Sequence, residues 1–368
     1  MPSMRKQPKS GMMGELALLA RIRARAAQAP HPGLLVGMGD DCALLRPGDG
    51  EDLAVTTDLS IAGRHFRLDW HPAESVGHRT LARGLSDLAA MGARPVAAFL
   101  SLGLPRELVK NPKARSAREP QSTSAARGAP SRQSSWIDRF LDGFLALAQV
   151  HETPLAGGDL AESPVPVADV ILTGAVRRGK ALLRSGARPG DLLYVTGSLG
   201  DAAVGLACLT ELGAAFARTR PRSRLKDLPR IPPRLMALLS PHLYPQPRVA
   251  QGLWLAQHSM ASAAIDLSDG LSTDLAHLCE ASGVAAEVDA AALPVHPAAT
   301  AAQALDGGEE YELLFTVSPT CRVPNSIEGV SVTRIGRIAE VRRATPRVVL
   351  VTARGAEPLV ARGWEHFS

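Results

Sequence analysis

Apolar residues along the chain recur at two spacings, one typical of strands and the other typical of helices. Short apolar runs that end at Gly, Pro or Asp predict strands, and longer runs with apolar positions three and four apart predict helices. The predicted strands cover residues 34–41, 52–58, 96–104, 167–176, 191–197, 311–317, 332–338 and 347–353. The predicted helices cover residues 14–28, 74–92, 136–151, 200–209, 247–257 and 268–282. Because the two kinds interleave, the expected fold class is α/β or α+β.

A turn rich in Gly, Arg and Pro separates the chain into two parts. It covers residues 177–191, after one predicted strand and before another. The length of 368 residues is enough for two domains, and we expect their boundary near residue 178. The expected organisation is a flexible N-terminal extension (1–12), an N-terminal domain (13–177) and a C-terminal α/β domain (178–368).

The composition excludes several classes of protein. Hydrophobic residues make up 45% of the chain, which is typical of a globular protein. Aromatic residues make up only 4%, which argues against stacking platforms for single-stranded nucleic acid. No apolar run reaches about 18 residues, so we expect no membrane span. The four cysteines are scattered without a C-x-x-C motif, which predicts reduced thiols in a cytoplasmic protein.

The net positive charge comes from one segment. Six basic residues and one acidic residue lie between Lys110 and Arg132, so this segment accounts for the whole net charge of +5. The surrounding residues 110–135 contain no aliphatic side chain larger than alanine, and such a composition cannot offset the entropy of folding. We expect a disordered surface insertion rather than an arm that contacts RNA or a membrane. Neither nucleic acid nor a membrane is therefore an expected partner.

Aspartates recur at the ends of apolar strands or beside glycine. They are Asp40, Asp41, Asp58, Asp87, Asp159, Asp266 and Asp269. Each one alone suits a helix cap or a turn. Several of them converging at the carboxyl ends of strands would repel one another unless cations neutralised them. Carboxylates are typical Mg²⁺ ligands beside phosphates, so the set predicts several Mg²⁺ ions and a polyphosphate such as ATP.

Hydroxyls and glycines lie beside these carboxylates. Thr56, Thr57 and Ser268 suit phosphate contacts through their hydroxyl groups, and Gly157 and Gly158 suit a close backbone approach. The chain lacks the Gly-rich phosphate-loop and dinucleotide-binding patterns. Phosphoryl transfer depends mostly on positioning and charge neutralisation, so we expect no catalytic nucleophile or base.

The stretch "AIDLSDGLSTDL" at residues 264–275 holds three aspartates after an apolar lead-in that resembles the start of a buried helix. We expect Asp266 and Asp269 to be metal ligands, with Ser268 between them for phosphate. We expect Asp269 also to cap a helix that begins at Gly270. Asp274 is expected on a solvated helix face, away from the site.

Longer motifs resemble the thiamine-monophosphate kinase family. They are "GMGDDCALL", "VTTDLSIAGRHF", "LARGLSDLAAMGARP", "LAGGD", "GKALLRSGARPGDLLYVTGSLGDAAVGL", "SAAIDLSDGLSTDLAHLCEASG", "LDGGEEYELLFTV" and "RGWEHF". The resemblance implies phosphorylation of thiamine monophosphate by Mg-ATP to give thiamine diphosphate. It also implies the two-domain aminoimidazole-ribonucleotide-synthetase-like fold, in a homodimer whose N-terminal sheets pair with ATP nearby.

The resemblance also assigns roles to residues. The implied metal ligands and metal-shell contacts are Asp41, Thr56, Thr57, Asp58, Asp87, Asp159, Asp266 and Asp269. The implied ATP contacts are Gly158, Asp159, Arg184 and Ser268, and the implied thiamine-phosphate contacts are His65, Glu309 and Trp364. A guanidinium can clamp phosphate oxygens, and a cationic thiazolium suits a carboxylate and an aromatic face.

The chain departs from the family pattern after "GGD". It continues with "LAES" at residues 160–163 where the family has Thr-Thr-Arg-Gly, so two hydroxyls and an arginine are missing beside the phosphates. Two alternatives stay open: another ATP-using synthetase of the same superfamily, or an inactive paralogue that binds nucleotide.

Overall fold

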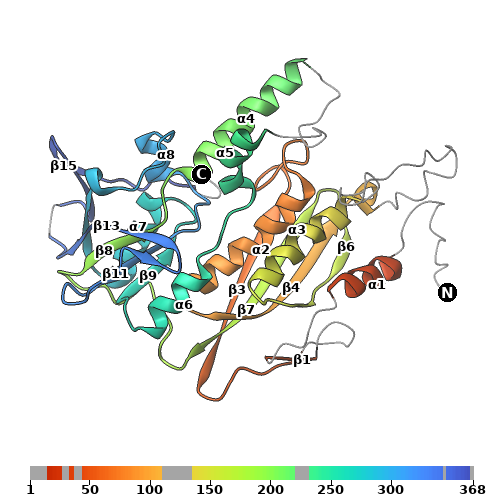
Figure 1. Ribbon diagram of the computed structural model, residues 1–368, viewed down its shortest axis with the longest axis horizontal. Helices are drawn as coiled ribbons and strands as arrows, with labels where there is room; N and C mark the ends of the chain where they lie inside the picture. The colour runs from red at the N-terminus through yellow and green to blue at the C-terminus, as the bar shows by residue number, and fades with distance from the viewer. Residues whose placement is uncertain are drawn as a thin grey trace.

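The computed structural model describes residues 15–26, 33–36, 44–109, 135–219, 232–342 and 345–364. The predicted N-terminal extension, Asp41 and residues 110–134 of the predicted insertion lie outside this part of the chain. Figure 1 shows two sheets with helices packed against them, which confirms the predicted mixed α/β class. Among the helices of the described ranges, none has the length and apolar character that crossing a bilayer requires.

The first sheet is built from the N-terminal half of the chain. Its strand order is β3 (Glu51–Ile61), β7 (Val167–Arg177), β4 (Arg94–Leu104) and β5 (Leu155–Gly157), and β6 (Leu160–Glu162) also pairs with β4. The long strands β3, β7 and β4 are antiparallel neighbours, whereas β5 and β6 run parallel to β4. Before this sheet the chain forms α1 (Glu15–Ala26) and a small antiparallel pair, β1 (Leu34–Val36) and β2 (Leu44–Leu45).

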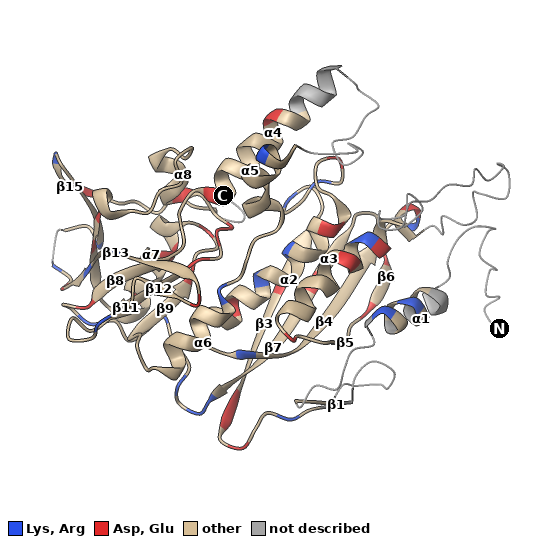
Figure 2. Cartoon of the chain, viewed as in Figure 1, with Lys and Arg blue, Asp and Glu red and all other residues tan. Residues whose placement is uncertain are grey.

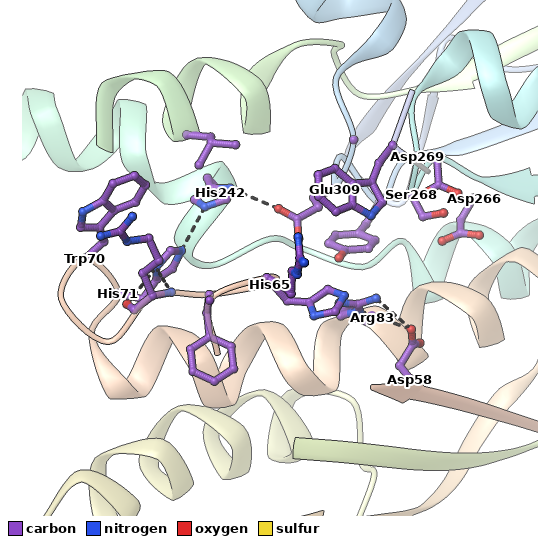
Figure 3. A pocket seen from close by; sticks show the side chains of 18 of the residues that line it. Asp58, His65, Trp70, His71, Arg83, His242, Asp266, Ser268, Asp269 and Glu309 are labelled. Atoms are coloured by element: carbon purple, nitrogen blue, oxygen red, sulfur yellow. Dashed lines mark hydrogen bonds and ion pairs between the residues drawn. The ribbon is translucent and has the colours of Figure 1, made fainter. Parts of the chain in front are cut away.

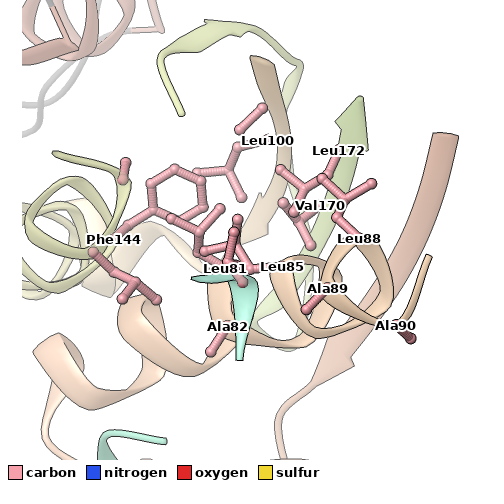
Figure 4. Close-up of a cluster of buried hydrophobic side chains, with 14 of the residues drawn as sticks. Leu81, Ala82, Leu85, Leu88, Ala89, Ala90, Leu100, Phe144, Val170 and Leu172 are labelled. Atoms are coloured by element: carbon pink, nitrogen blue, oxygen red, sulfur yellow. The ribbon is translucent and has the colours of Figure 1, made fainter. Parts of the chain in front are cut away.

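Two helices cover one face of the first sheet: α2 (Ala73–Ala90) and α3 (Trp136–Val150). A short 3₁₀ helix, η1 (Arg106–Val109), follows β4. Leucines of α2 meet Leu172 of β7 and Phe144 of α3 in the buried cluster of Figure 4. Burial of these side chains is the main force that holds α2 between the sheet and α3.

The second sheet is built from the C-terminal half. Its order is β15 (Gly355–Pro358), β14 (Val348–Thr352), β10 (Ala285–Asp289), β13 (Val330–Ala339), β8 (Leu192–Thr196), β11 (Leu313–Val317) and β9 (Ala263–Asp266), with β12 (Ser326–Ile327) paired to β13. The helices of this half are α4 (Asp201–Thr219), α5 (Pro233–Leu243), α6 (Val249–Gln257), α7 (Leu271–Ser282), α8 (Ala301–Asp306) and the 3₁₀ helix η5 (Ala290–Ala292). The domain boundary near residue 178 stays a prediction.

Some elements differ from the sequence prediction. The apolar lead-in of the 264–275 stretch is the end of strand β9, and helix α7 starts only at Leu271. The prediction also missed α5, which contains Pro241, and the six-residue helix α8. A proline inside a helix and a helix of fewer than two turns both leave a weak periodic signal.

Glycine lets α2 and α3 approach closely. A β-carbon at Gly77 would lie 1.9 Å from the carbonyl oxygen of Phe140, a backbone atom that cannot move without shifting α3. The hydrogen of glycine therefore sets the distance between the two helices.

The exchange Gly77→Ala should destabilise the protein by about 1–3 kcal/mol, because the added methyl group forces α2 and α3 apart. In an uncrowded helix the same exchange stabilises by up to about 1 kcal/mol, so the sign of the effect is decisive. The measurement is the midpoint of urea unfolding, followed by circular dichroism. A midpoint above that of the wild type would contradict this packing.

Candidate functional site

A cavity of about 440 Å³ lies where the two halves of the chain meet. Its lining comes from β3, the loop that follows it, α2, α4, α5, the turn after β9, the 308–311 segment and the C-terminal segment (Figure 3). Acidic residues gather on the loops in this region between the two sheets (Figure 2). The lining includes six of the predicted site residues that have acidic or hydroxyl side chains: Asp58, Asp87, Asp266, Ser268, Asp269 and Glu309.

Helix α2 carries polar side chains toward this cavity at a spacing of four residues. Arg79, Arg83 and Asp87 follow one another along one helix face. Arg79 donates to Glu309, Arg83 pairs with Asp58 at 3.3 Å, and Asp87 accepts a hydrogen bond from Thr56. Arg83 and Asp87 are therefore held by strand β3, and Arg79 is held by the segment before β11.

Three carboxylates form the acidic end of the cavity. Burial raises the pKa of Asp58 to about 6, with Arg83 opposing the shift and the charge of Asp87 adding to it. Burial also raises the pKa of Asp87. Asp266 accepts a hydrogen bond from Ser86 at 2.7 Å, and its pKa is raised to about 8 by burial and by the charge of Asp87. The three groups therefore hold protons more tightly than ordinary carboxylates, as expected where cations are to be bound.

The turn between β9 and α7 corrects two expectations. Asp274 is buried, and its carboxylate accepts the backbone N–H groups of Ser268, Asp269 and Gly270 at 3.0–3.1 Å. The prediction of a solvated Asp274 was wrong. The prediction that Asp269 caps the helix was also wrong, because the N-cap of α7 is Gly270 and no side chain caps the helix there. Burial, followed by the charge of Asp269, raises the pKa of Asp274 to about 7. Ser268 and Asp269 are left on the cavity side of the turn.

The segment before β11 has a strained backbone. Glu309 and Tyr311 have φ values of 66° and 53°, in the left-handed region that side chains other than glycine rarely adopt. Their amides donate to the carbonyls of Ser268 and Leu267 at 2.7 and 2.8 Å. These two bonds tie the segment to the turn after β9 and direct Glu309 into the cavity. Strain of this kind is common at functional sites.

Glu309 meets a buried polar network. Arg79 donates to it at 2.5 Å, and Nδ1 of His242 lies 3.5 Å from its other oxygen. Burial alone would raise the pKa of Glu309, but the charge of Arg79 and the Arg79 hydrogen bond lower it to about 2. Glu309 is therefore a carboxylate at neutral pH.

A pair of histidines completes this network. Nε2 of His71 and Nε2 of His242 lie 3.2 Å apart, and burial together with the charge of Arg79 lowers the pKa of both rings. Both histidines are thus neutral at pH 7. Sequence reasoning missed His71, His242, Arg79 and Arg83. The four-residue spacing of the two arginines and Asp87 on a predicted helix was the one available signal for them.

The predicted substrate residues His65 and Trp364 also line the cavity. Nδ1 of His65 accepts the backbone N–H of Ile61 at 3.0 Å, which fixes the ring at the start of the loop after β3. The N–H of Trp364 donates to the carbonyl of Asp269 at 3.1 Å. This bond brings the C-terminal segment over the N-terminal end of α7, and the Trp364 side chain stays 52% exposed.

Other predicted residues lie away from the cavity. Thr57 is exposed on the opposite face of β3 from Thr56 and Asp58, because side chains alternate along a strand. Asp159 is exposed between β5 and β6, where its carboxylate accepts the N–H of Leu160 at 2.8 Å.

Gly158 and Arg184 are likewise outside the cavity lining. Gly158 has φ +145°, and a β-carbon there would lie 2.0 Å from the carbonyl oxygen of Leu100, so this position requires glycine. Arg184 is exposed, and its positive charge lowers the pKa of Asp87 against the larger effect of burial. The "LAES" stretch forms β6, and its Glu162 pairs with Arg106 at 2.6 Å on the surface.

The carboxylates fit magnesium by their chemistry, although not as a closed set of ligands. Within the described ranges, no three His, Cys, Asp or Glu side chains are grouped closely enough to hold a metal ion. Asp58, Asp87 and Asp266 are nevertheless hard oxygen donors whose raised pKa values reflect burial and, for Asp58 and Asp266, mutual repulsion. A divalent cation would relieve both effects. The magnesium site stays a prediction.

Comparison with known proteins gives the family. The family models described as AIR synthase related protein, N-terminal and C-terminal domains, match residues 39–176 and 188–349. The thiamine-monophosphate kinase of Escherichia coli K12 is 35% identical, with 96% of this chain and 98% of that protein covered. The crystal structure of the thiamine-monophosphate kinase of Stenotrophomonas maltophilia K279a is 36% identical with a TM-score of 0.69, covering 92% of this chain and 96% of that one. The structure of AaThiL complexed with AMPPCP and TMP is 27% identical with a TM-score of 0.66, covering 99% and 100% of the two chains.

The pKa of Asp266 leads to a pH-dependent prediction. Because this pKa is raised to about 8 in the folded protein, the stability that the group contributes is complete below its usual value of 3.8 and is lost as the pH rises through 8. Asn at this position cannot ionise. Asp266→Asn should therefore be more stable than the wild type at pH 8 by at least about 1 kcal/mol, with the difference vanishing near pH 4.

The measurement is urea unfolding of both proteins between pH 4 and 8 in the presence of a chelator. A second series with saturating Mg²⁺ is the control, since a bound cation should stabilise only the wild-type carboxylate. A stability difference that stays constant across the pH range would contradict the assignment.

Proposed function

The chain belongs to the thiamine-monophosphate kinase family, within the AIR synthase related proteins, and we propose that it transfers the γ-phosphoryl group of ATP to thiamine monophosphate. An oxygen of the acceptor phosphate bonds to the γ-phosphorus, the bond from that phosphorus to the β,γ-bridging oxygen breaks, and ADP leaves. The products are thiamine diphosphate and ADP.

One observation carries this proposal: a single cavity holds both a cluster of acidic side chains and a separate ionised carboxylate, that of Glu309. Asp58, Asp87 and Asp266 stand at the acidic end. Glu309 carries a negative charge and shares the cavity lining with Trp364, a combination suited to a positively charged thiazolium ring. Phosphoryl transfer between two anionic substrates needs such a combination of positioning and charge neutralisation.

We assign the acidic end to Mg²⁺ and ATP. The proposed metal ligands and metal-shell contacts at this end are Thr56, Asp58, Asp87, Asp266 and Asp269, and the proposed ATP contact there is Ser268. The family resemblance also implies Asp41, Thr57 and Asp159 as metal contacts and Gly158, Asp159 and Arg184 as ATP contacts; of these, Asp41 lies outside the described residues and the others lie outside the cavity lining. When bound, Mg²⁺ neutralises phosphate charge and orients the γ-phosphoryl group. The protein's own part is to hold the carboxylates in place: Thr56 donates to Asp87, and Ser86 donates to Asp266.

We assign the other end to thiamine monophosphate, with His65, Glu309 and Trp364 as its contacts. Arg79 keeps Glu309 ionised and fixed in position. The bond from the Trp364 amide to Asp269 links this end of the cavity to the acidic end. Binding of the substrate and positioning of the carboxylates are thereby coupled through one turn.

We propose that the protein is a homodimer in which the β3 strands of two copies meet. In the described chain, β3 is an end strand of its sheet, with β7 as its neighbour there. Leu53, Val55 and Leu59 are exposed on its outward face, an arrangement that favours pairing with another copy. Thr57 lies on the same face, so the hydroxyl of Thr57 would be part of the interface with a partner docked there.

We further propose a cytoplasmic location and a domain boundary near residue 178. The cysteines at 208, 279 and 321 are free thiols, which suits a reducing compartment. Strand β7 of the first sheet ends at Arg177, and β8 of the second sheet begins at Leu192.

A direct assay tests the proposed function. Purified full-length protein with Mg-ATP and thiamine monophosphate should yield equal amounts of thiamine diphosphate and ADP, separated by chromatography. Asp87→Asn should lower turnover by at least about 100-fold while the melting temperature holds or rises, because a buried carboxylate is replaced by a neutral group. ATP binding without thiamine diphosphate would favour an inactive paralogue, and ADP release with another acceptor would favour a different synthetase.

The homodimer leads to a separate prediction. Val55 is 59% exposed on β3. The exchange Val55→Glu should convert the dimer to a monomer, because the dimer interface would have to bury an unpaired charge. Light scattering after size-exclusion chromatography measures the mass. Val341→Glu is the matched control, because Val341 is 51% exposed in the other half of the chain. A wild-type monomer, or a dimer unaffected by Val55→Glu, would contradict the proposal.

A further inference from the structure

Three arginines line the cavity, and they differ in how their charge is used. Arg67 donates through two nitrogens to Asp69 at 3.1 and 2.8 Å, and its guanidinium lies 4.1 Å from the ring centre of Trp70. Its side chain is 51% exposed. Arg64 is also exposed. Arg83 is only 19% exposed and belongs to the buried helix α2, so its charge acts in a less solvated part of the cavity.

The contact that Arg83 makes is loose. Its Nε and one Nη both lie 3.3 Å from the same oxygen of Asp58. Arg139, by comparison, grips both oxygens of Glu74 at 2.7 Å. A guanidinium has five N–H donors in a planar fork, and two long contacts to one oxygen use little of that capacity.

Arg79, one helical turn earlier, has the opposite arrangement. Its side chain is 6% exposed, and its donors reach Glu309 and the carbonyls of His65 and His242. This fixed set of acceptors makes Arg79 a positioning residue for Glu309. Arg83 has no comparable set among the described residues and faces the cavity.

Arg83 also stands at the junction of the two ends. Asp58, its partner, belongs to the acidic cluster, while the charge of Glu309 acts on Arg83 from the substrate side. The acceptor phosphate and the γ-phosphoryl group, both anionic, must meet between these ends. A cation at this point would reduce the repulsion between the two phosphate groups. The planar guanidinium of Arg83 can also donate to two phosphate oxygens at once.

We propose that Arg83 is a substrate-binding residue that contacts the phosphate group of thiamine monophosphate, exchanging Asp58 for that phosphate. The inference rests on the proposed function. In the free protein Arg83 balances the charge of Asp58. With metal at the acidic end, Asp58 has another cation, and the guanidinium turns its donors to the phosphate.

The test compares two ligands that differ only in the phosphate group. Isothermal titration calorimetry measures the Kd of thiamine monophosphate and of thiamine, with Mg²⁺ and a non-hydrolysable ATP analogue present. Arg83→Met should raise the Kd of thiamine monophosphate by about 10- to 100-fold, which is the usual effect of losing charge-assisted hydrogen bonds. The Kd of thiamine should change less than about twofold. Arg83→Lys, which keeps the charge and loses the fork, should give an intermediate loss and also serves if the Met variant does not fold.

Several outcomes would overturn the inference. Equal weakening of thiamine and thiamine monophosphate would mean that Arg83 only maintains the cavity as the counter-ion of Asp58. A loss of affinity confined to the ATP analogue would mean that Arg83 contacts the nucleotide. Arg67→Met is the comparison within the same cavity. If Arg67→Met abolishes the difference in Kd between thiamine monophosphate and thiamine, and Arg83→Met does not, the phosphate contact belongs to Arg67.

The wild-type protein separates this inference from the proposed function. If the wild type forms thiamine diphosphate while Arg83→Met still discriminates between the two ligands, the inference alone is wrong. If the wild type forms no thiamine diphosphate and binds neither ligand, the proposed function is wrong and the inference falls with it.

Discussion

The arrangement of the site depends on one constraint: α2 is buried along most of its length and yet carries polar groups that must find partners. Its apolar side chains pack between the first sheet and α3, with Gly77 setting the helix distance. Its polar groups meet three other segments of the chain: Arg83 and Asp87 pair with β3, Ser86 with β9, and Arg79 with Glu309. Because a buried polar group without a partner is costly, the same helix that holds the first domain together also fixes where β3, β9 and the 308–312 segment stand.

Charge is distributed unequally along this helix. At the Arg79 end, the charge and hydrogen bond of Arg79 hold Glu309 ionised, so the cavity keeps a fixed negative charge there. At the Asp87 end, burial and neighbouring carboxylates keep Asp58 and Asp266 ready to hold protons, and the proposed Mg²⁺ would replace those protons. The charge of Glu309 at the first end is balanced within the protein. The carboxylates at the second end are balanced fully only when ligands bind. This contrast is what a kinase with an ionic acceptor requires, since its metal and nucleotide must come and go.

Short backbone contacts join the two ends. Asp274 holds the amides of the turn after β9, and the amides of Glu309 and Tyr311 bind the carbonyls of the same turn from the other side. The left-handed backbone of those two residues is maintained by these bonds. The turn that carries Ser268 and Asp269 is therefore over-determined, and a binding site whose geometry must be kept within a fraction of an ångström benefits from such a frame.

The sequence by itself determined the class of fold, most of the long strands and helices, and the family, because these follow from local periodicity and from ordered motifs. It also identified Asp58, Asp87, Asp266, Asp269 and Glu309 as cavity residues, from strand ends and from the family resemblance. Only the tertiary structure decided that Asp274 is buried, that Thr57 faces away from Thr56, and that Arg79 meets Glu309 across 230 positions. The physical reason is that a side chain's partner depends on how distant elements pack, and a local pattern of apolar and polar residues carries no information about that choice.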